Sequence, residues 1–204
     1  MTHVTLVAFD DMDLLDTGGP YEVLLTASRL LARDGHLDPM VIELAGVRVG
    51  PVTAYGGLSL NATRALTEIA ATDVVIVPGA VNVDALVGNA ELLAEVSRLS
   101  QIASITLSVC TGSFLLGAAG LLDDRPWTTH HEDVEGLVQL IGPTGAHHDC
   151  RWVDSGSIIT GGGLSSGIAA ALHLVERLHG RDLAVRTAHQ IEYVWDPDDG
   201  VIDG

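Results

Sequence analysis

Cys110 is the residue whose type and surroundings best suit nucleophilic chemistry. It follows the apolar run Ser104–Val109, and the small residues Thr111-Gly112-Ser113 then allow a sharp turn into a helix. This pattern predicts that Cys110 lies at the carboxyl end of a strand, where open α/β sheets bind ligands. A helix N-terminus beside it would lower the pKa of the thiol. The alternative is that Cys110 is a small buried hydrophobic residue.

A nucleophile needs a proton partner, and Asp16 is the best-placed candidate. It is the last of four aspartates that follow the first expected strand, and it immediately precedes a helix expected to open at Gly18-Gly19-Pro20. A carboxylate beside a thiolate is repelled, so the pair should share a proton and the pKa of the aspartate should be raised. The alternative role of Asp16 is to cap that helix.

A second possible nucleophile is Ser165, because Gly163-Leu164-Ser165-Ser166-Gly167 formally matches the serine nucleophile elbow. Its acid and base would have to come from the C-terminal region, for example Asp182 and His189, which leaves little room for a triad. We interpret this segment as a glycine-rich turn that lets a strand pass into a closely packed helix.

Two histidine-containing segments invite a metal-binding interpretation, namely His130-His131-Glu132 and His147-His148-Asp149-Cys150. Adjacent histidines usually point in different directions, and no Cys-x-x-Cys or His-x-x-x-His pair supplies tetrahedral spacing. The sequence therefore predicts no metal. Cys150 lacks a strand-to-helix context and is not expected to be a nucleophile. No glycine-rich phosphate loop is present, so no cofactor is expected.

Alternating strands and helices must position these groups. Apolar runs predict strands at 3–9, 40–45, 73–77 and 102–109, and hairpins at 48–60 and 151–160. Apolar residues at helical spacing predict helices at 18–33, 82–100, 114–122, 131–141, 165–178 and 183–193. The tail after 195 is expected to be frayed. Strands that alternate with helices in this way form a mostly parallel sheet sandwiched by helices.

Composition narrows the possible functions. The chain has 204 residues, a mass of 21.3 kDa and a formal net charge of −17. We expect a single domain over 1–204. The acidic surface argues against nucleic acid and anionic membranes as partners. No apolar run is long enough to cross a bilayer, and no signal peptide precedes the first strand, so a cytoplasmic location with reduced thiols is expected.

Several segments together resemble the ThiJ/PfpI superfamily, which belongs to the class I glutamine amidotransferase-like group with its flavodoxin-like α/β fold. The resemblance covers nearly the whole chain. The segments that carry it are Ser108–Ser113, Leu116–Leu122, Thr128-Thr129-His130, Leu15–Val23, Val77-Pro78-Gly79, Thr160–Gly163 and Gln190–Tyr193. The pattern is most similar to isonitrile hydratases and to the sensor domains of AraC-type regulators.

The resemblance implies roles for residues of this chain. Cys110 would be the nucleophile, Asp16 the acid that hydrogen-bonds it, and Thr111 a contact of that acid or of the substrate. The backbone N–H groups of Gly79 and Thr111 would stabilise developing charge, and Gly79, Ala80 and His130 would border the substrate. Relatives with protease or glyoxalase activity often have a histidine where Thr111 stands, and many relatives have glycine where Ala80 stands.

The implied activity is hydration of a small isonitrile, a small-molecule substrate, by a homodimer without a cofactor. Other cysteine-dependent reactions of the superfamily, such as glyoxal hydration or amide hydrolysis, remain open. So does a ligand or redox sensor that performs no chemistry. AraC-type relatives carry an additional DNA-binding region, and the chain ends at Gly204, which favours the expectation of a stand-alone enzyme.

Overall fold

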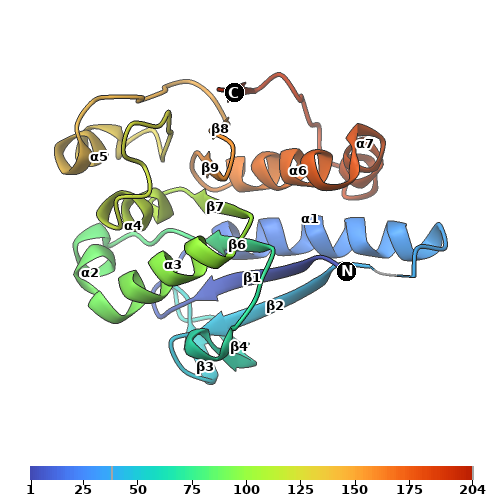
Figure 1. Cartoon of the computed structure of the whole chain (residues 1–204), viewed down its shortest axis with the longest axis horizontal. Coiled ribbons are helices and arrows are strands. Elements are labelled where there is room, and N and C mark those ends of the chain that lie inside the picture. Colours follow the sequence, from blue (N-terminus) through green and yellow to red (C-terminus); the bar gives the residue numbers. More distant parts are fainter. Residues whose placement is uncertain (38, 204) are drawn as a thin grey trace.

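Eight strands form a mostly parallel sheet with helices on both faces, as the sequence predicts (Figure 1). The computed structural model describes residues 1–37 and 39–203, so the last residue of the expected domain lies outside the described residues. Strands β8 and β10 run opposite to the other six. In spatial order the strands are β10 (Gly200–Ile202), β8 (Trp152–Asp154), β9 (Ile158–Gly161), β7 (Ile105–Val109), β6 (Val74–Val77), β1 (His3–Ala8), β2 (Val41–Gly46) and β5 (Arg64–Ala65).

The central strands are apolar along their whole length because both of their faces are covered. In β1, Val4 and Leu6 belong to the core on one side of the sheet, whereas Val7 belongs to the core on the other side. Successive side chains of a strand point to opposite faces, so a strand buried on both faces needs consecutive apolar residues. All residues of β6 and β7 are buried.

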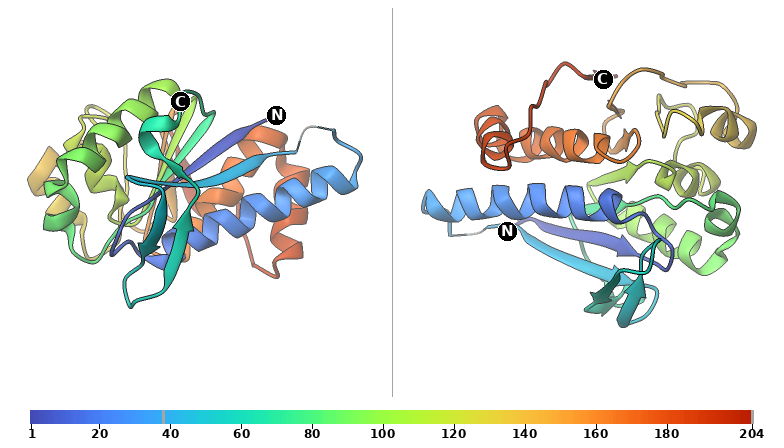
Figure 2. Two further views of the ribbon diagram at one scale, coloured as in Figure 1. Left: turned by 90° about the horizontal axis from the view of Figure 1, so that it is seen from below. Right: turned by 180° about the vertical axis from the view of Figure 1, so that it is seen from behind.

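The helices divide into two layers, which Figure 2 shows from two further directions. Helices α1, α6 and α7 pack against one another on one face, and α2, α3 and α4 cover the other face together with α5. Their bounds are α1 (Leu14–Arg33), α2 (Val83–Gly88), α3 (Ala90–Ile102), α4 (Gly112–Ala118), α5 (Val134–Ile141), α6 (Ser166–His179) and α7 (Arg181–Gln190).

Helix α1 begins at Leu14 and not at Gly18, which corrects the expected boundary. Asp13 caps the helix by accepting a hydrogen bond from the Leu15 N–H at 3.1 Å, so Asp16 is not the cap but part of the first turn. Pro20 lies inside the helix. Gly19 allows close packing of α1 on α6, since a Cβ there would lie 3.0 Å from Ile168 Cγ1.

Other boundaries also differ from the sequence-based expectation: the helices expected over 114–122, 131–141 and 183–193 are α4, α5 and α7 with the bounds given above. The helix expected over 82–100 is two helices, because Asn89 ends α2 and its side chain caps α3. The strand expected from 102 begins at Ile105, since α3 extends to Ile102. The tail expected to be frayed forms β10, which pairs in parallel with β8.

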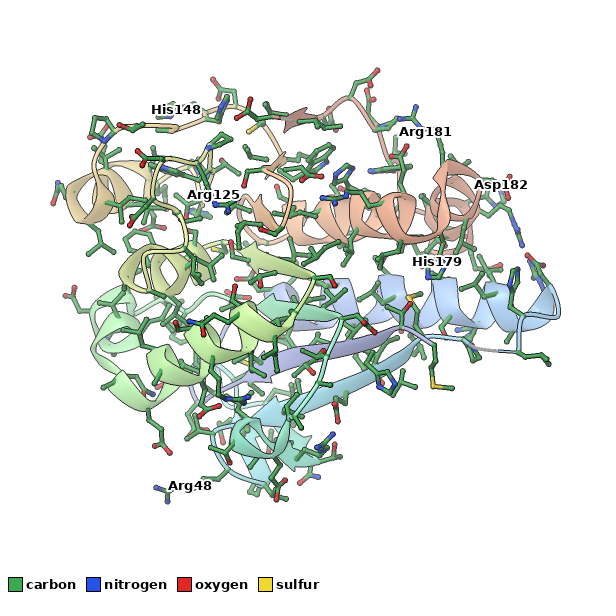
Figure 3. All side chains as sticks on the ribbon, viewed as in Figure 1. Arg48, Arg125, His148, His179, Arg181 and Asp182 are labelled. Carbon is green, nitrogen blue, oxygen red and sulfur yellow. The ribbon has the colours of Figure 1, made fainter. Side chains whose placement is uncertain are left out.

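The excursion expected at 48–60 is confirmed as a separate antiparallel hairpin, β3 (Gly50–Thr53) and β4 (Ser59–Ala62). It is followed by the short β5 and a single 3₁₀ turn, Leu66–Glu68, which the sequence pattern did not indicate. Figure 3 shows that side chains fill the space between the ribbons of the two layers. Among the described helices, none combines the length and apolarity that a membrane span requires.

Candidate active site

Cys110 lies on a sharp, strained turn between β7 and α4. Its backbone has φ 57°, in the left-handed region that non-glycine residues seldom occupy. The Cys110 N–H donates to the carbonyl oxygens of Gly161 and Gly162, at 3.1 and 3.0 Å, which fastens the turn to the end of β9. Gly112 is required because a Cβ there would lie 2.9 Å from the carbonyl group of Pro78. This is the geometry of a nucleophile elbow.

Asp16 is fully buried beside this turn. Its Oδ2 accepts a hydrogen bond from the Gly79 N–H at 3.1 Å. The nearby Cys110 thiol and Leu164 N–H also act on this carboxyl group, since both lower its pKa. Its other oxygen, Oδ1, makes no well-aligned hydrogen bond within the described residues. Burial, and then the charge of Asp13, raises the pKa of Asp16 to about 7, which agrees with the expected direction.

Cys110 is only 9% exposed, and its environment favours the protonated form of the thiol. Burial, and then the charge of Asp16, raises the pKa of Cys110 to about 12, although N–H groups of Thr111 and Leu164 partly oppose the shift. The helix N-terminus lowers this pKa through the Thr111 N–H as expected, but burial and the nearby carboxylate outweigh it, so the net shift is upward. At neutral pH the thiol therefore keeps its proton, whereas Asp16 is close to the midpoint of its own titration.

Gly79 and Thr111 lie at the site, but their polar groups already have partners. The Gly79 N–H donates to Asp16, so it holds the acid in place and is not free for a developing anion. The Thr111 hydroxyl donates to the Ala80 carbonyl at 2.8 Å and accepts from the Ala80 N–H at 2.9 Å. The Thr111 hydroxyl therefore joins the turn after β6 to the turn that carries Cys110, and it forms no hydrogen bond with Asp16. The Thr111 N–H faces the Cys110 sulfur.

Leu164 is the group that sequence reasoning missed. Its N–H lowers the pKa of both Cys110 and Asp16, and its own backbone has φ 46°. The available signal was Gly163-Leu164-Ser165, which we interpreted only as a tight turn. Ser165 does not form a triad with the expected partners, since its hydroxyl accepts from Arg151 at 3.5 Å and Asp182 pairs with Arg186.

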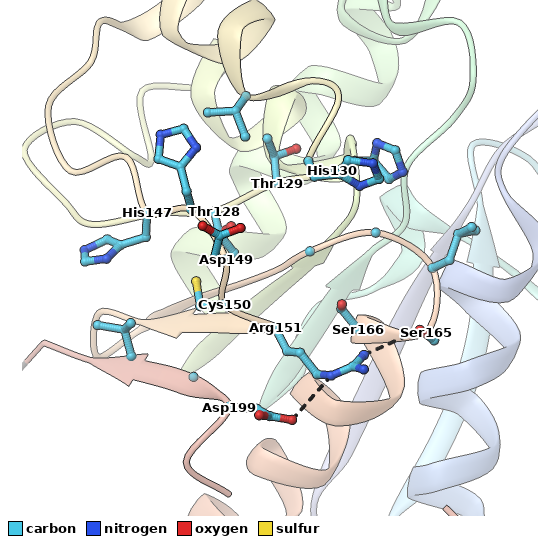
Figure 4. Close-up of a pocket in the computed structure, with 18 of the residues that line it drawn as sticks. Thr128, Thr129, His130, His147, Asp149, Cys150, Arg151, Ser165, Ser166 and Asp199 are labelled. Carbon is cyan, nitrogen blue, oxygen red and sulfur yellow. Dashed lines mark hydrogen bonds and ion pairs between the residues drawn. The ribbon is translucent and has the colours of Figure 1, made fainter. Parts of the chain in front are cut away.

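A hollow of about 1080 Å³ borders the segment that carries Leu164. Thr129, His130, Cys150, Arg151 and Leu164 are among its lining residues, whereas Gly79 and Ala80 are not. In Figure 4, Arg151 lies between Asp199 and Ser165, and His130 lies on a loop beyond Thr129. Cys110 and Asp16 do not line the hollow either, but two of its lining residues reach the site: Leu164, and Thr129, whose hydroxyl donates to the Cys110 carbonyl at 3.0 Å.

His130 and Cys150 both line this hollow and lie on different sides of it (Figure 4). The His130 ring packs on the backbone at Gly163, where a Cβ would lie 3.0 Å from its Nε2. Its Nδ1 lies 3.2 Å from an Asp133 carboxylate oxygen. Cys150 is half-buried, and burial is the main cause of its raised pKa. It is not joined to Cys110 by a disulfide.

These features define an α/β protein with a cysteine at a strained strand-to-helix turn and a buried carboxyl group beside it. The chain belongs to the DJ-1/PfpI family, whose model matches residues 2–177.

Comparison with individual proteins gives the same family. The chain is 33% identical to an isonitrile hydratase of Pseudomonas putida, over 94% of this chain and 78% of that protein. It is 30% identical to the HTH-type transcriptional regulator CdhR of Pseudomonas aeruginosa, over 76% of this chain but only 46% of the regulator. The crystal structure of a ThiJ/PfpI family protein from Pseudomonas syringae covers 96% of this chain, with 76% of its own length aligned, 26% identity and a TM-score of 0.82.

Proposed function

We propose that this protein hydrates a small isonitrile to an N-substituted formamide, with Cys110 as the nucleophile and Asp16 as the group that moves the proton. The observation that carries the proposal is the contact between the thiol and a fully buried carboxyl group whose pKa is raised to about 7. A proton-transfer group is most effective when its pKa is close to the operating pH. Similarity to the P. putida isonitrile hydratase supports this choice of substrate.

In the first step, the ionised Asp16 takes the proton of the Cys110 thiol as the sulfur attacks the terminal carbon of the isonitrile. A C–S bond forms, and Asp16 returns the proton to that same carbon, which gives a thioimidate. The N–H of Leu164 acts on both side chains and keeps the thiol and the carboxyl group close together while the proton moves. No histidine is needed, because one carboxyl group both accepts and donates.

In the second step, water adds to the thioimidate carbon. Asp16 takes one proton from the water and passes it to the nitrogen, which leaves a tetrahedral carbon bearing OH, NH and sulfur. Collapse of this intermediate breaks the C–S bond, releases the formamide, and returns the hydroxyl proton to the sulfur through Asp16. The sum of both steps is addition of one water to the isonitrile, so neither an oxidant nor a cofactor is consumed.

The test is incubation of the purified protein with an alkyl isonitrile, with formamide formation followed by ¹³C NMR. The wild type should convert the isonitrile, and Cys110→Ala should lose at least about 10³-fold in rate because no nucleophile remains. Cys150→Ala is the matched control and should stay active. Formamide formation by Cys110→Ala, or methylglyoxal turnover without isonitrile turnover, would contradict the proposal.

A second candidate function is ligand sensing without chemistry, which one observation favours. Cys110 is almost completely buried and its pKa is raised to about 12, so the resting thiol is poorly nucleophilic. The similarity to a transcriptional regulator is compatible with this role. Tight binding of a small molecule, without turnover of isonitriles, α-ketoaldehydes or amides, would favour sensing over hydration.

Three coarser proposals accompany the activity. Residues 1–204 form one domain, because strands from both ends of the chain share one sheet. The substrate is a small molecule that enters beside His130 and Leu164, where the hollow meets the site. The working unit is a homodimer in the cytoplasm.

A further inference from the structure

We propose that His130, His131 and Glu132 form a binding site for a divalent transition metal of the zinc class, separate from the Cys110–Asp16 pair. Each of the three side chains offers one ligand atom, and within the described residues these atoms all lie within 4.8 Å of one another. The proposal does not depend on the isonitrile activity, because none of the three residues is assigned a chemical step.

A tight turn brings the three donors together. The Asp133 N–H donates to the His130 carbonyl at 2.9 Å, so residues 130–133 reverse direction just before α5. The expectation that adjacent histidines diverge does not hold here, because the two rings lie with their centroids 4.4 Å apart and their planes tilted by 37°. The turn therefore places two imidazole groups and a carboxylate on one side of the loop.

His130 is held in an orientation that suits a ligand. Its ring packs on the backbone at Gly163, and its Nδ1 lies 3.2 Å from Asp133 Oδ2 and 3.3 Å from the Glu132 N–H. In this structure Nδ1 accepts a hydrogen bond from the Glu132 N–H; when a cation occupies Nε2, that bond gives way and Nδ1 carries a proton that Asp133 accepts. A carboxylate behind a histidine in this way fixes the tautomer and makes the ring a better ligand. Asp133 is thus a positioning residue for the site.

The donor set selects the kind of metal. Two imidazoles and one carboxylate, with a position left for water, are a common zinc set, whereas calcium and magnesium prefer oxygen ligands alone. Zinc–ligand bonds of about 2.0–2.1 Å place neighbouring donors about 3.3 Å apart. His131 and Glu132 are exposed, so rotation of their side chains can close the remaining gap without disturbing the core.

A second histidine pair in the same hollow provides an internal control. His147 and His148 also line it, but they do not belong to the group of donors that lie within reach of one ion. Figure 4 shows His147 on a different loop from His130. If zinc bound to any pair of neighbouring histidines, both pairs would bind it. The proposed site involves only His130 and His131, the pair before α5.

The experiment is competition for Zn²⁺ between the full-length protein and a chromophoric chelator at pH 7.5, followed by the visible spectrum of the Co²⁺ form. We expect one ion per chain. His131→Asn and Glu132→Gln should each weaken zinc binding at least about 10-fold, and Asp133→Asn about 10-fold, as expected for loss of a ligand or its support. Circular dichroism checks that the variants are folded.

Two controls separate this site from other donors. The double variant His147→Asn/His148→Asn should bind zinc as the wild type does, and so should Cys110→Ala, which removes the reactive thiol. The proposal is overturned if the wild type binds no zinc, if His131→Asn and Glu132→Gln leave the affinity unchanged, or if either control variant loses the ion. These readouts are independent of isonitrile turnover.

Discussion

At the scale of single residues, Cys110 and Asp16 depend on each other for their protonation states. The carboxylate raises the pKa of the thiol, and the thiol's hydrogen bond partly opposes the rise in the pKa of Asp16 that burial causes. With pKa values of about 12 for Cys110 and about 7 for Asp16, the proton stays on sulfur at rest, so Asp16 can accept it only as the C–S bond forms. Asp16 should therefore control both the ionisation of the thiol and the transfer of its proton.

Asp16→Asn should separate these two effects. Loss of the negative charge should lower the pKa of Cys110, so the thiolate should appear at lower pH than in the wild type, as measured by absorbance at 240 nm in a Cys150→Ala background. Isonitrile hydration should nevertheless fall by about 10²–10⁴-fold, because the proton-transfer group is gone. In the wild type, kcat/KM should rise with pH through about 7, as Asp16 loses its proton and becomes a base.

Asp13→Asn is the matched control for this prediction. Asparagine keeps the cap of α1, and the charge of Asp13 is the smallest of the contributions that raise the pKa of Cys110. This variant should shift the thiolate midpoint only slightly and retain hydration, with the rise of kcat/KM moved to lower pH because the charge of Asp13 helps to raise the pKa of Asp16. An Asp16→Asn protein with full activity would show that Asp16 serves only to hold the loop at Gly79.

The sequence predicted the side chains of the site better than its backbone groups. Cys110 and Asp16 were found because the strand-to-helix pattern and the aspartate-rich loop are both visible in residue types, and the structure brings them together. The Leu164 N–H could not be found in the same way, because any residue type carries an N–H and only φ 46° aims it at the pair. The sequence indicated Gly79 as a site residue, but it did not indicate that the Gly79 N–H donates its hydrogen bond to Asp16.

At the scale of elements, a buried ionic cluster fastens β8 to α6. The Asp154 carboxylate is 2.7 Å from His173 Nε2 and 2.8 Å from Arg177 Nη1, and the His173 ring stacks on Trp152. Burial alone would raise the pKa of Asp154, but hydrogen bonds from His173 and Gly156 and the charge of Arg177 outweigh it and lower the pKa. β8 is antiparallel to β9, so Asp154 pairs with Ile159 and its chain runs away from the end of β9 that adjoins Cys110.

Asp154→Ala should destabilise the fold by about 3 kcal/mol at pH 7, because it leaves His173 and Arg177 without the carboxylate that they share. A pKa lowered in the folded state means that the stabilisation is present above the unfolded-state value of about 3.9 and is lost as the pH falls. Urea unfolding should therefore show a difference between wild type and variant that shrinks below about pH 4. Activity at low temperature should persist.

The exposed pair Arg29–Glu22 supplies the control for this cluster. The two groups are 4.0 Å apart with side chains more than half exposed. Arg29→Ala should leave the free energy of unfolding unchanged within error, because solvent screens such pairs. Equal effects of Arg29→Ala and Asp154→Ala would contradict the assignment of stability to the buried cluster.

Elements with regular apolar patterns were predicted well, and elements set by caps or by pairing with distant strands were not. The runs that became β1, β6 and β7 are apolar because both faces are buried, which a sequence displays directly. The start of α1 was missed because Asp13 caps it and Pro20 is tolerated in its second turn. The sequence did not predict β10, because three residues in a polar segment show no apolar strand pattern. The segment is a strand because it pairs with β8.

At the scale of the whole molecule, apolar side chains remain exposed near the start of α1 and on the β3–β4 excursion. Leu15 and Tyr21 of α1 are 41% and 37% exposed, and Tyr55 and Leu58 of the hairpin loop are 60% and 52% exposed. A groove of about 430 Å³ lies between α1 and strands β2 and β4 and is lined by Leu14, Tyr21, Leu44 and Leu60, among others. Apolar groups gathered in this way indicate a protein interface.

We expect this surface to join two copies of the chain, each of 21.3 kDa. Light scattering after gel filtration should give about twice that mass. Tyr21→Glu, which places a charge in the groove, should shift the protein to the monomer, whereas Val185→Glu, at a 52% exposed position on α7, should not. Because each copy carries a net charge of −17, added salt should strengthen the dimer by screening repulsion between the copies. A monomeric wild type, or a dimer that dissociates as salt is added, would contradict an apolar interface between like-charged copies.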